Sequence, residues 1–129
     1  MTSILVEIAA GELIDKMAIL EIKLERIGDP SKLANVRREH GVLAEVYRNS
    51  VVETPQLVAL AKELKQINAA IWAIEDEIRE LERVKDFGER FVALARSVYQ
   101  TNDRRAAVKR EINAVLNSRL VEEKSYSAY

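Results

Sequence analysis

Apolar side chains recur along most of this chain at alternating spacings of three and four residues, the pattern of an amphipathic helix with a heptad seam. The longest unbroken run lies between residues 57 and 81. Its members are Leu57, Leu60, Leu64, Ile67, Ile71, Ile74, Ile78 and Leu81. Thr54 and Pro55 precede the run and are typical of a helix cap and a first helical turn. The pattern therefore predicts one long helix over residues 55–84.

Shorter runs of the same pattern predict three more helices. One covers residues 12–27 and is apolar on two sides. A second covers residues 30–50 and begins with the start signal Asp29–Pro30. The seam slips in phase around residues 85–88, where we expect a kink or a short break, and a last helix continues from there to about residue 117.

The two ends of the chain lack this periodicity. Residues 3–9 are apolar but have no strand partner, so we expect a short extended N-terminal arm that packs against the helices. Residues 118–129 have little helical order, and we expect them to dock on the bundle or on a partner subunit. The predicted fold is all-α: an antiparallel bundle of about four long helices with coiled-coil-like heptad packing, forming a single domain over residues 1–129.

Two of the predicted helices leave apolar surface uncovered. The helix over 12–27 needs partners on two sides, and the helix over 55–84 would be about 45 Å long, more than its neighbours cover. We therefore expect a homodimer, most simply a two-fold one, or a higher homo-oligomer. The same surface would also suit a different protein partner.

Polar side chains interrupt the inner stripe of the last helix. On a helical wheel Asn102, Arg105 and Lys109 fall within about 40° of Val98, the direction to which Ile112 returns. Burying an unpaired cation costs several kcal/mol or more, so each needs an explanation.

Three interpretations of this stripe stay open. The helix could restart at residues 101–103, which are good capping residues, and turn the cations outward. An anionic ligand could be clamped by the two cations and the amide. Or carboxylates of other helices could pair with the cations, the candidates being Glu12, Asp15, Glu21, Glu75 and Asp76.

Charge and composition narrow the function classes. The 20 basic and 21 acidic residues give a net charge of −1, so we expect no nucleic-acid partner. The chain has no cysteine, which excludes disulfides and thiolate metal sites within it. Its first residues lack the basic segment of a signal peptide, and no stretch approaches the roughly 20 apolar residues of a membrane span. We expect a soluble, cytoplasmic protein.

No catalytic, metal-binding or cofactor motif is recognisable. His40 is the only histidine, and the positions three and four residues away from it hold no acidic side chain or second ligand. We therefore interpret His40 as a hydrogen-bonded seam residue and not as a metal ligand or general base. Trp72 lies beside the seam, which favours lateral packing over ligand stacking.

Three blocks of the sequence resemble a family of small, uncharacterised, all-helical bacterial proteins classed as a domain of unknown function. They are GELIDKMAILEIKLERI at 11–27, LARSVYQTNDRRAAVKREIN at 94–113 and EEKSY at 122–126, and the resemblance covers almost the whole chain. The polar positions that match the family's pattern are Asp15, Lys16, Lys23, Asn102, Asp103, Arg105, Lys109 and Asn113. Ala10 departs from the pattern, which has a serine there as the N-cap of the first helix.

The resemblance supplies no reaction. It implies an accessory role in surface-polysaccharide metabolism, because related domains lie beside, or are fused to, glycosyltransferase and tetratricopeptide-type proteins. A second resemblance, of architecture alone, is to the helical chorismate mutases, which are small, all-α and dimeric and bind a dicarboxylate between helices through Arg and Lys.

We therefore expect a non-enzymatic helical module for assembly or protein interaction, accessory to surface-polysaccharide glycosyltransferases. The alternative is a protein or enzyme that binds a small anion, a carboxylate or a phosphate, at a polar site between the first and last helices. In that alternative Arg105 and Lys109 clamp the anion and Asn102 orients it. Lys16 or Lys23 would add a fourth contact.

Overall fold

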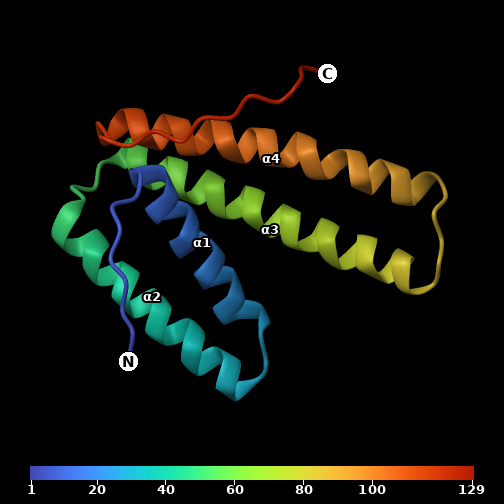
Figure 1. Cartoon of the computed structure of the whole chain (residues 1–129), viewed down its shortest axis with the longest axis horizontal. Coiled ribbons are helices and arrows are strands. Elements are labelled where there is room, and N and C mark those ends of the chain that lie inside the picture. Colours follow the sequence, from blue (N-terminus) through green and yellow to red (C-terminus); the bar gives the residue numbers. More distant parts are fainter.

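Four helices and no strands make up the regular structure of the computed structural model, which describes residues 1–129 (Figure 1). The helices are α1 (Ala10–Arg26), α2 (Pro30–Ser50), α3 (Pro55–Arg83) and α4 (Glu89–Val115). The predicted all-α bundle is confirmed. None of these helices combines the length and the apolar character needed to cross a membrane.

The start signals act as predicted. The Asp29 side chain accepts a 2.9 Å hydrogen bond from the backbone N–H of Ser31, and Thr54 Oγ1 accepts one of 3.2 Å from that of Leu57. The slip in the seam marks a complete break. Lys85 takes a left-handed conformation with φ of 60°, and the chain reverses there before α4 begins.

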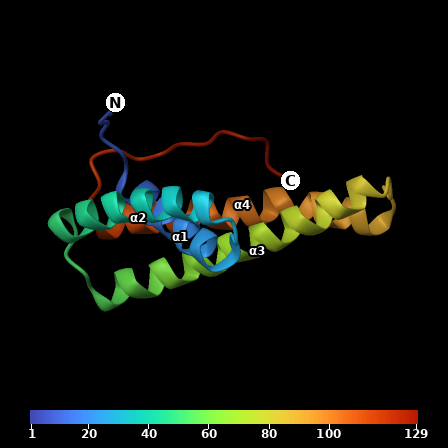
Figure 2. The ribbon, with the colours of Figure 1, turned by 90° about the horizontal axis from the view of Figure 1, so that it is seen from below.

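The helices form two hairpins that cross (Figures 1 and 2). The long α3 and α4 run antiparallel to each other. Helix α1 packs against both of them, over the half of the hairpin that contains the start of α3 and the end of α4. Since α2 packs along α1 and makes no close backbone approach to α3 or α4, it lies on the outside. The far half of the α3–α4 hairpin, near the 84–88 connection, extends beyond α1 and α2 (Figure 1).

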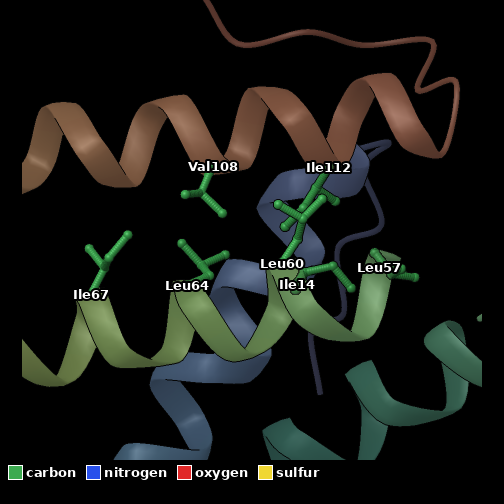
Figure 3. Packing of buried hydrophobic residues seen from close by; sticks show 7 residues of the cluster. All are labelled: Ile14, Leu57, Leu60, Leu64, Ile67, Val108 and Ile112. Atoms are coloured by element: carbon green, nitrogen blue, oxygen red, sulfur yellow. The ribbon is translucent and has the colours of Figure 1, made fainter. Parts of the chain in front are cut away.

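The core sits where three helices meet (Figure 3). It consists of Ile14 from α1, Val108 and Ile112 from α4, and four seam residues of α3, Leu57, Leu60, Leu64 and Ile67. Burying one such side chain contributes about 1.5–3 kcal/mol. The later seam residues of α3, Ile74, Ile78 and Leu81, are only half-buried and lie in the part of the hairpin that extends beyond α1 and α2.

The first nine residues form no helix or strand. Ile4, Leu5 and Val6 are exposed, so the expected packing of this segment on the helices does not occur within one chain. The apolar stripes of α1 face α2, α3 and α4. Glu7 instead forms a bidentate ion pair with Arg119 beyond α4.

Candidate functional site

The polar stripe of α4 faces α1. The helix runs unbroken through residues 101–103, so the restart that would have turned the stripe outward does not occur. The helix has no need to break, because Lys109 is buried and Arg105 half-buried with partners in reach. Two of their partners, Glu12 and Asp15, were among the predicted acidic candidates, and a third, Glu122, was not. We call Arg105, Lys109, Glu12, Asp15 and Glu122 together the α1–α4 charge cluster.

Asp15 is the hub of the cluster. Its side chain is 1% exposed and binds residues of two other helices. Asn68 of α3 donates a 2.8 Å hydrogen bond to Oδ1 through Nδ2. Arg105 of α4 donates to both carboxylate oxygens, from Nε over 2.9 Å to Oδ1 and from Nη2 to Oδ2. This fork geometry is the strongest form of the Arg–carboxylate contact, and it fixes the register of α4 against α1.

Lys109 lies one turn further along α4 and is shared among carboxylates. Its Nζ is 2.7 Å from Glu12 Oε2, 3.3 Å from Glu122 Oε2 and 3.8 Å from Asp15 Oδ2. Lys16 joins the edge of the cluster, 3.6 Å from Glu12 and exposed. The buried cation is therefore matched by charges of the same chain.

The pKa values of both cations move in the direction that keeps them charged. The hydrogen bond to Asp15 is the main reason that the pKa of Arg105 is raised. Burial lowers the pKa of Lys109, but the hydrogen bond to Glu12 and the charges of Asp15 and Glu122 outweigh it, so that pKa is raised as well. Neither group is set up to give up a proton near neutral pH.

The N-terminus of α1 is capped from α4 and not by its own residues. Ala9 is the N-cap and offers no side-chain acceptor, in line with the missing serine at Ala10. Asn113 Oδ1 accepts from the backbone N–H of Gly11 over 2.7 Å, and Ser118 Oγ accepts from that of Ala10 over 3.0 Å. The sequence marked Asn113 as a matching polar position but gave no sign of this role.

Other predicted residues lie outside the cluster. Asn102 lines the groove beneath residues 124–129 and forms no side-chain hydrogen bond to the cluster, and Lys23 forms no ion pair. Among the candidate counter-ions, Glu21 lies near Lys65, Glu75 pairs with Arg79, and Asp76 forms no ion pair. Asn68, which completes the hub, was not predicted; its only signal is an amide beside the seam of α3.

His40 lies away from this site, between α2 and α1. Its Nε2 is buried and has no hydrogen-bond partner, and the nearest carboxylate oxygen, Glu21 Oε1, is 3.8 Å away. The predicted hydrogen bond is therefore absent at Nε2, and the same Glu21 carboxylate lies 3.8 Å from Lys65 on α3.

Two cavities adjoin Arg105. A polar cavity of about 470 Å³ is lined by Glu12, Arg105, Lys109, Glu122, Glu123, Lys124 and Tyr126. A smaller and mostly apolar cavity of about 300 Å³ lies at the crossing of α1, α3 and α4. Trp72 forms part of its wall and is half-buried.

Residues 4–129 match a family described as a family of unknown function, DUF6165. The chain belongs to the DUF6165 family. The match confirms the resemblance to a domain of unknown function that the three sequence blocks indicated. No curated protein and no solved structure matched the chain in the corresponding comparisons.

The buried charges of this DUF6165 chain join three helices. Each buried cation already has carboxylate partners, and the residues present include no group of three His, Asp or Glu side chains placed to hold a metal ion. The hydrogen bonds and ion pairs of Asp15 and Glu12 connect α1 to α3 and α4 beside the apolar core. They therefore fix the direction in which the α3–α4 hairpin extends.

Proposed function

We propose that this DUF6165 protein is a non-enzymatic assembly module whose copies pair through the distal half of the α3–α4 hairpin, residues 71–91. One observation carries the proposal. The solvent-accessible surface is 9057 Å² for a mass of 14.6 kDa. A compact monomer of that mass exposes about 6900 Å², so about 2100 Å² is in excess, shared between the exposed terminal segments (residues 1–7 and 119–129) and the part of the α3–α4 hairpin that extends beyond α1 and α2.

Half-buried and exposed apolar side chains line that distal half, while other exposed ones lie in the two terminal segments and on α2. The seam of α3 continues through Ile74, Ile78 and Leu81, which are half-buried and lie beyond the reach of α1 and α2. Phe87 at the tip is exposed and meets Phe91 edge-to-face, with ring centroids 5.2 Å apart. A partner surface that covered this strip would complete the seam with coiled-coil-like packing.

A second copy is the occupant that we propose for the strip. Two hairpins related by a two-fold axis give a four-helix bundle, and a standard interface needs only about 800 Å² from each partner. Asp76 and Glu82 on α3 and Arg96 on α4 form no ion pair within the chain. Two-fold pairing brings α3 of one copy towards α4 of the other, where these charges complement each other.

The resemblance described above adds a process to the proposal: a role accessory to surface-polysaccharide glycosyltransferases. Anion binding is the second candidate, and the polar cavity beside Arg105 and Lys109 favours it. An anion there has to displace Glu12 or Glu122. A thermal-shift screen with phosphate and dicarboxylates tests it, and a stabilising hit that Arg105→Ala abolishes would support this candidate.

Light scattering coupled to size-exclusion chromatography at micromolar concentration tests the assembly. We expect twice the chain mass of 14.6 kDa. Ile78→Glu should shift the mass to that of one chain with helicity retained, and Phe87→Glu repeats the test at a side chain already exposed in the monomer. Val42→Glu, which charges an exposed apolar position on α2, is the matched control and should remain dimeric. A wild-type monomer would overturn the proposal.

A further inference from the structure

The C-terminal segment lies along the outer face of α4, away from the proposed dimer surface. Residues 119–129, here called the tail, form no helix or strand and run back along α4 from its C-terminal end (Figures 1 and 2). Every residue of the tail is exposed. Apolar burial within the chain therefore does little to hold it in place.

Polar and aromatic contacts hold the tail to α4. Besides the contact of Glu122 with Lys109, Glu123 Oε2 lies 3.2 Å from Arg110 Nη2. The last residue, Tyr129, stacks on Tyr99 with ring centroids 5.1 Å apart and planes 11° from parallel. Its hydroxyl donates a 2.6 Å hydrogen bond to Asp103 Oδ2. The face of α4 thus binds two carboxylates at one end and a tyrosyl ring at the other.

The tail spans this face without filling it. Between its two anchored ends lies a cavity of about 1020 Å³, floored by small side chains of α4 that include Val98, Ala106, Ala107 and Ala114. Tyr126, in the middle of the tail, is 83% exposed. The cavity is a groove that opens to solvent and that the exposed tail covers only in part, so a segment with bulkier or better placed side chains can bury more of this face of α4 than the tail does.

We infer that the outer face of α4 between Tyr99 and Ala114 is a docking surface for an extended, acidic, tyrosine-bearing segment of a partner protein, and that the tail is its competing occupant in the free chain. The contacts of the tail define the chemistry of the partner: carboxylates for Lys109 and Arg110, and an aromatic hydroxyl for Tyr99 and Asp103. Because the tail is tethered, its effective concentration is high, and a partner has to displace it. This surface is independent of the proposed dimer contact.

A peptide with the tail sequence RLVEEKSYSAY, residues 119–129, is the probe, with a fluorescent label at its N-terminus. The receptor is the full chain, either wild type or with a loosened tail carrying Glu122→Lys, Glu123→Lys and Tyr129→Ala. Fluorescence anisotropy should give binding to the loosened-tail chain that is at least about tenfold tighter than to the wild type. A peptide with both glutamates changed to lysine should not bind.

Three changes in the loosened-tail background locate the site. Arg110→Glu and Tyr99→Ala should each weaken peptide binding by about tenfold, and a peptide with Glu123→Arg should restore binding to the Arg110→Glu chain. Arg104→Glu, on α4 but outside the tail contacts, is the matched control and should leave binding unchanged at physiological salt. The inference is overturned if the peptide fails to bind the loosened-tail chain, or if binding is insensitive to Arg110→Glu.

Discussion

The backbone N–H of Gly11 at the start of α1 donates a 2.7 Å hydrogen bond to Oδ1 of Asn113, near the end of α4. The first N–H groups of a helix have no intrahelical partner, and a side chain just before the helix usually satisfies them. Here that acceptor comes from a residue 102 positions away in the chain. The start of α1 is therefore set by tertiary contact with α4.

Gly11 permits this contact because it has no side chain. A Cβ at this position would lie 2.4 Å from the backbone oxygen of Lys109, and a backbone atom cannot move aside cheaply. We expect Gly11→Ala to lower the free energy of unfolding by about 2–3 kcal/mol through overpacking. Gly41→Ala is the control: nothing lies within 4 Å of its Cβ, and it should stabilise α2 by about 0.5–1 kcal/mol. Urea denaturation measures both, and equal effects would refute the close-approach argument.

Removal of the remote cap should also be measurable. Asn113→Ala leaves the buried N–H of Gly11 without an acceptor, so we expect a loss of about 1–2 kcal/mol in the free energy of unfolding. Asn35→Ala, at an exposed asparagine on α2, should have little effect. Hydrogen exchange at the Gly11 amide provides a local check. Its protection should fall in Asn113→Ala, and unchanged protection would mean that the cap contributes nothing.

The sequence predicted most of the fold because its signals for helices are local. Asp29–Pro30 and Thr54–Pro55 place the starts of α2 and α3 through contacts within three residues of each cap. The start of α1 was predicted less well, because no local signal marks it. It was expected at residue 12 and lies at Ala10. No capping signal precedes α1, because its acceptors are Asn113 and Ser118.

The candidate site was only partly predictable for a related reason. The wheel placed Arg105 and Lys109 on the inner face of α4, and the cost of burying charge required counter-ions, which turned out to be Glu12 and Asp15. Periodicity shows which side of a helix faces inward, but not which residues of other helices that side contacts. The hydrogen bond from Asn68 to Asp15 was therefore not predicted. The path of the tail depends on a few polar contacts with α4, and no periodic pattern encodes it.

Breaking the hub at Asp15 should destabilise the fold. Asp15→Asn keeps the shape of the side chain but removes the charge that matches Arg105 and Lys109. Removing one partner of a fully buried pair costs about 3–5 kcal/mol. Arg105 is 28% exposed, so water screens part of this and we expect a loss of about 2–3 kcal/mol, measured by urea denaturation.

A double-mutant cycle separates the loss of the pair from the loss of packing. Asp15→Asn combined with Arg105→Gln removes both charges, so the double variant should lose less stability than the sum of the single variants. Glu77→Gln, which breaks the exposed bidentate contact with Arg90, is the control and should leave stability almost unchanged. Strictly additive losses would show that Asp15 and Arg105 are not coupled.

Stability at alkaline pH should depend on Tyr47. Burial, followed by the 2.7 Å hydrogen bond that its hydroxyl donates to Glu53 Oε1, raises the pKa of Tyr47 to about 12. An unfolded tyrosine titrates near pH 10, so the folded chain holds this proton more strongly. The contribution of Tyr47 to stability is therefore complete below about pH 10 and is lost as the pH rises through about 12.

Tyr47→Phe has no such proton to lose, so its stability should fall less steeply over this range than that of the wild type. Tyr126→Phe, at an exposed tyrosine without a hydrogen bond, should follow the wild-type curve. Parallel declines in wild type and Tyr47→Phe, measured by chemical denaturation at each pH, would contradict the assignment.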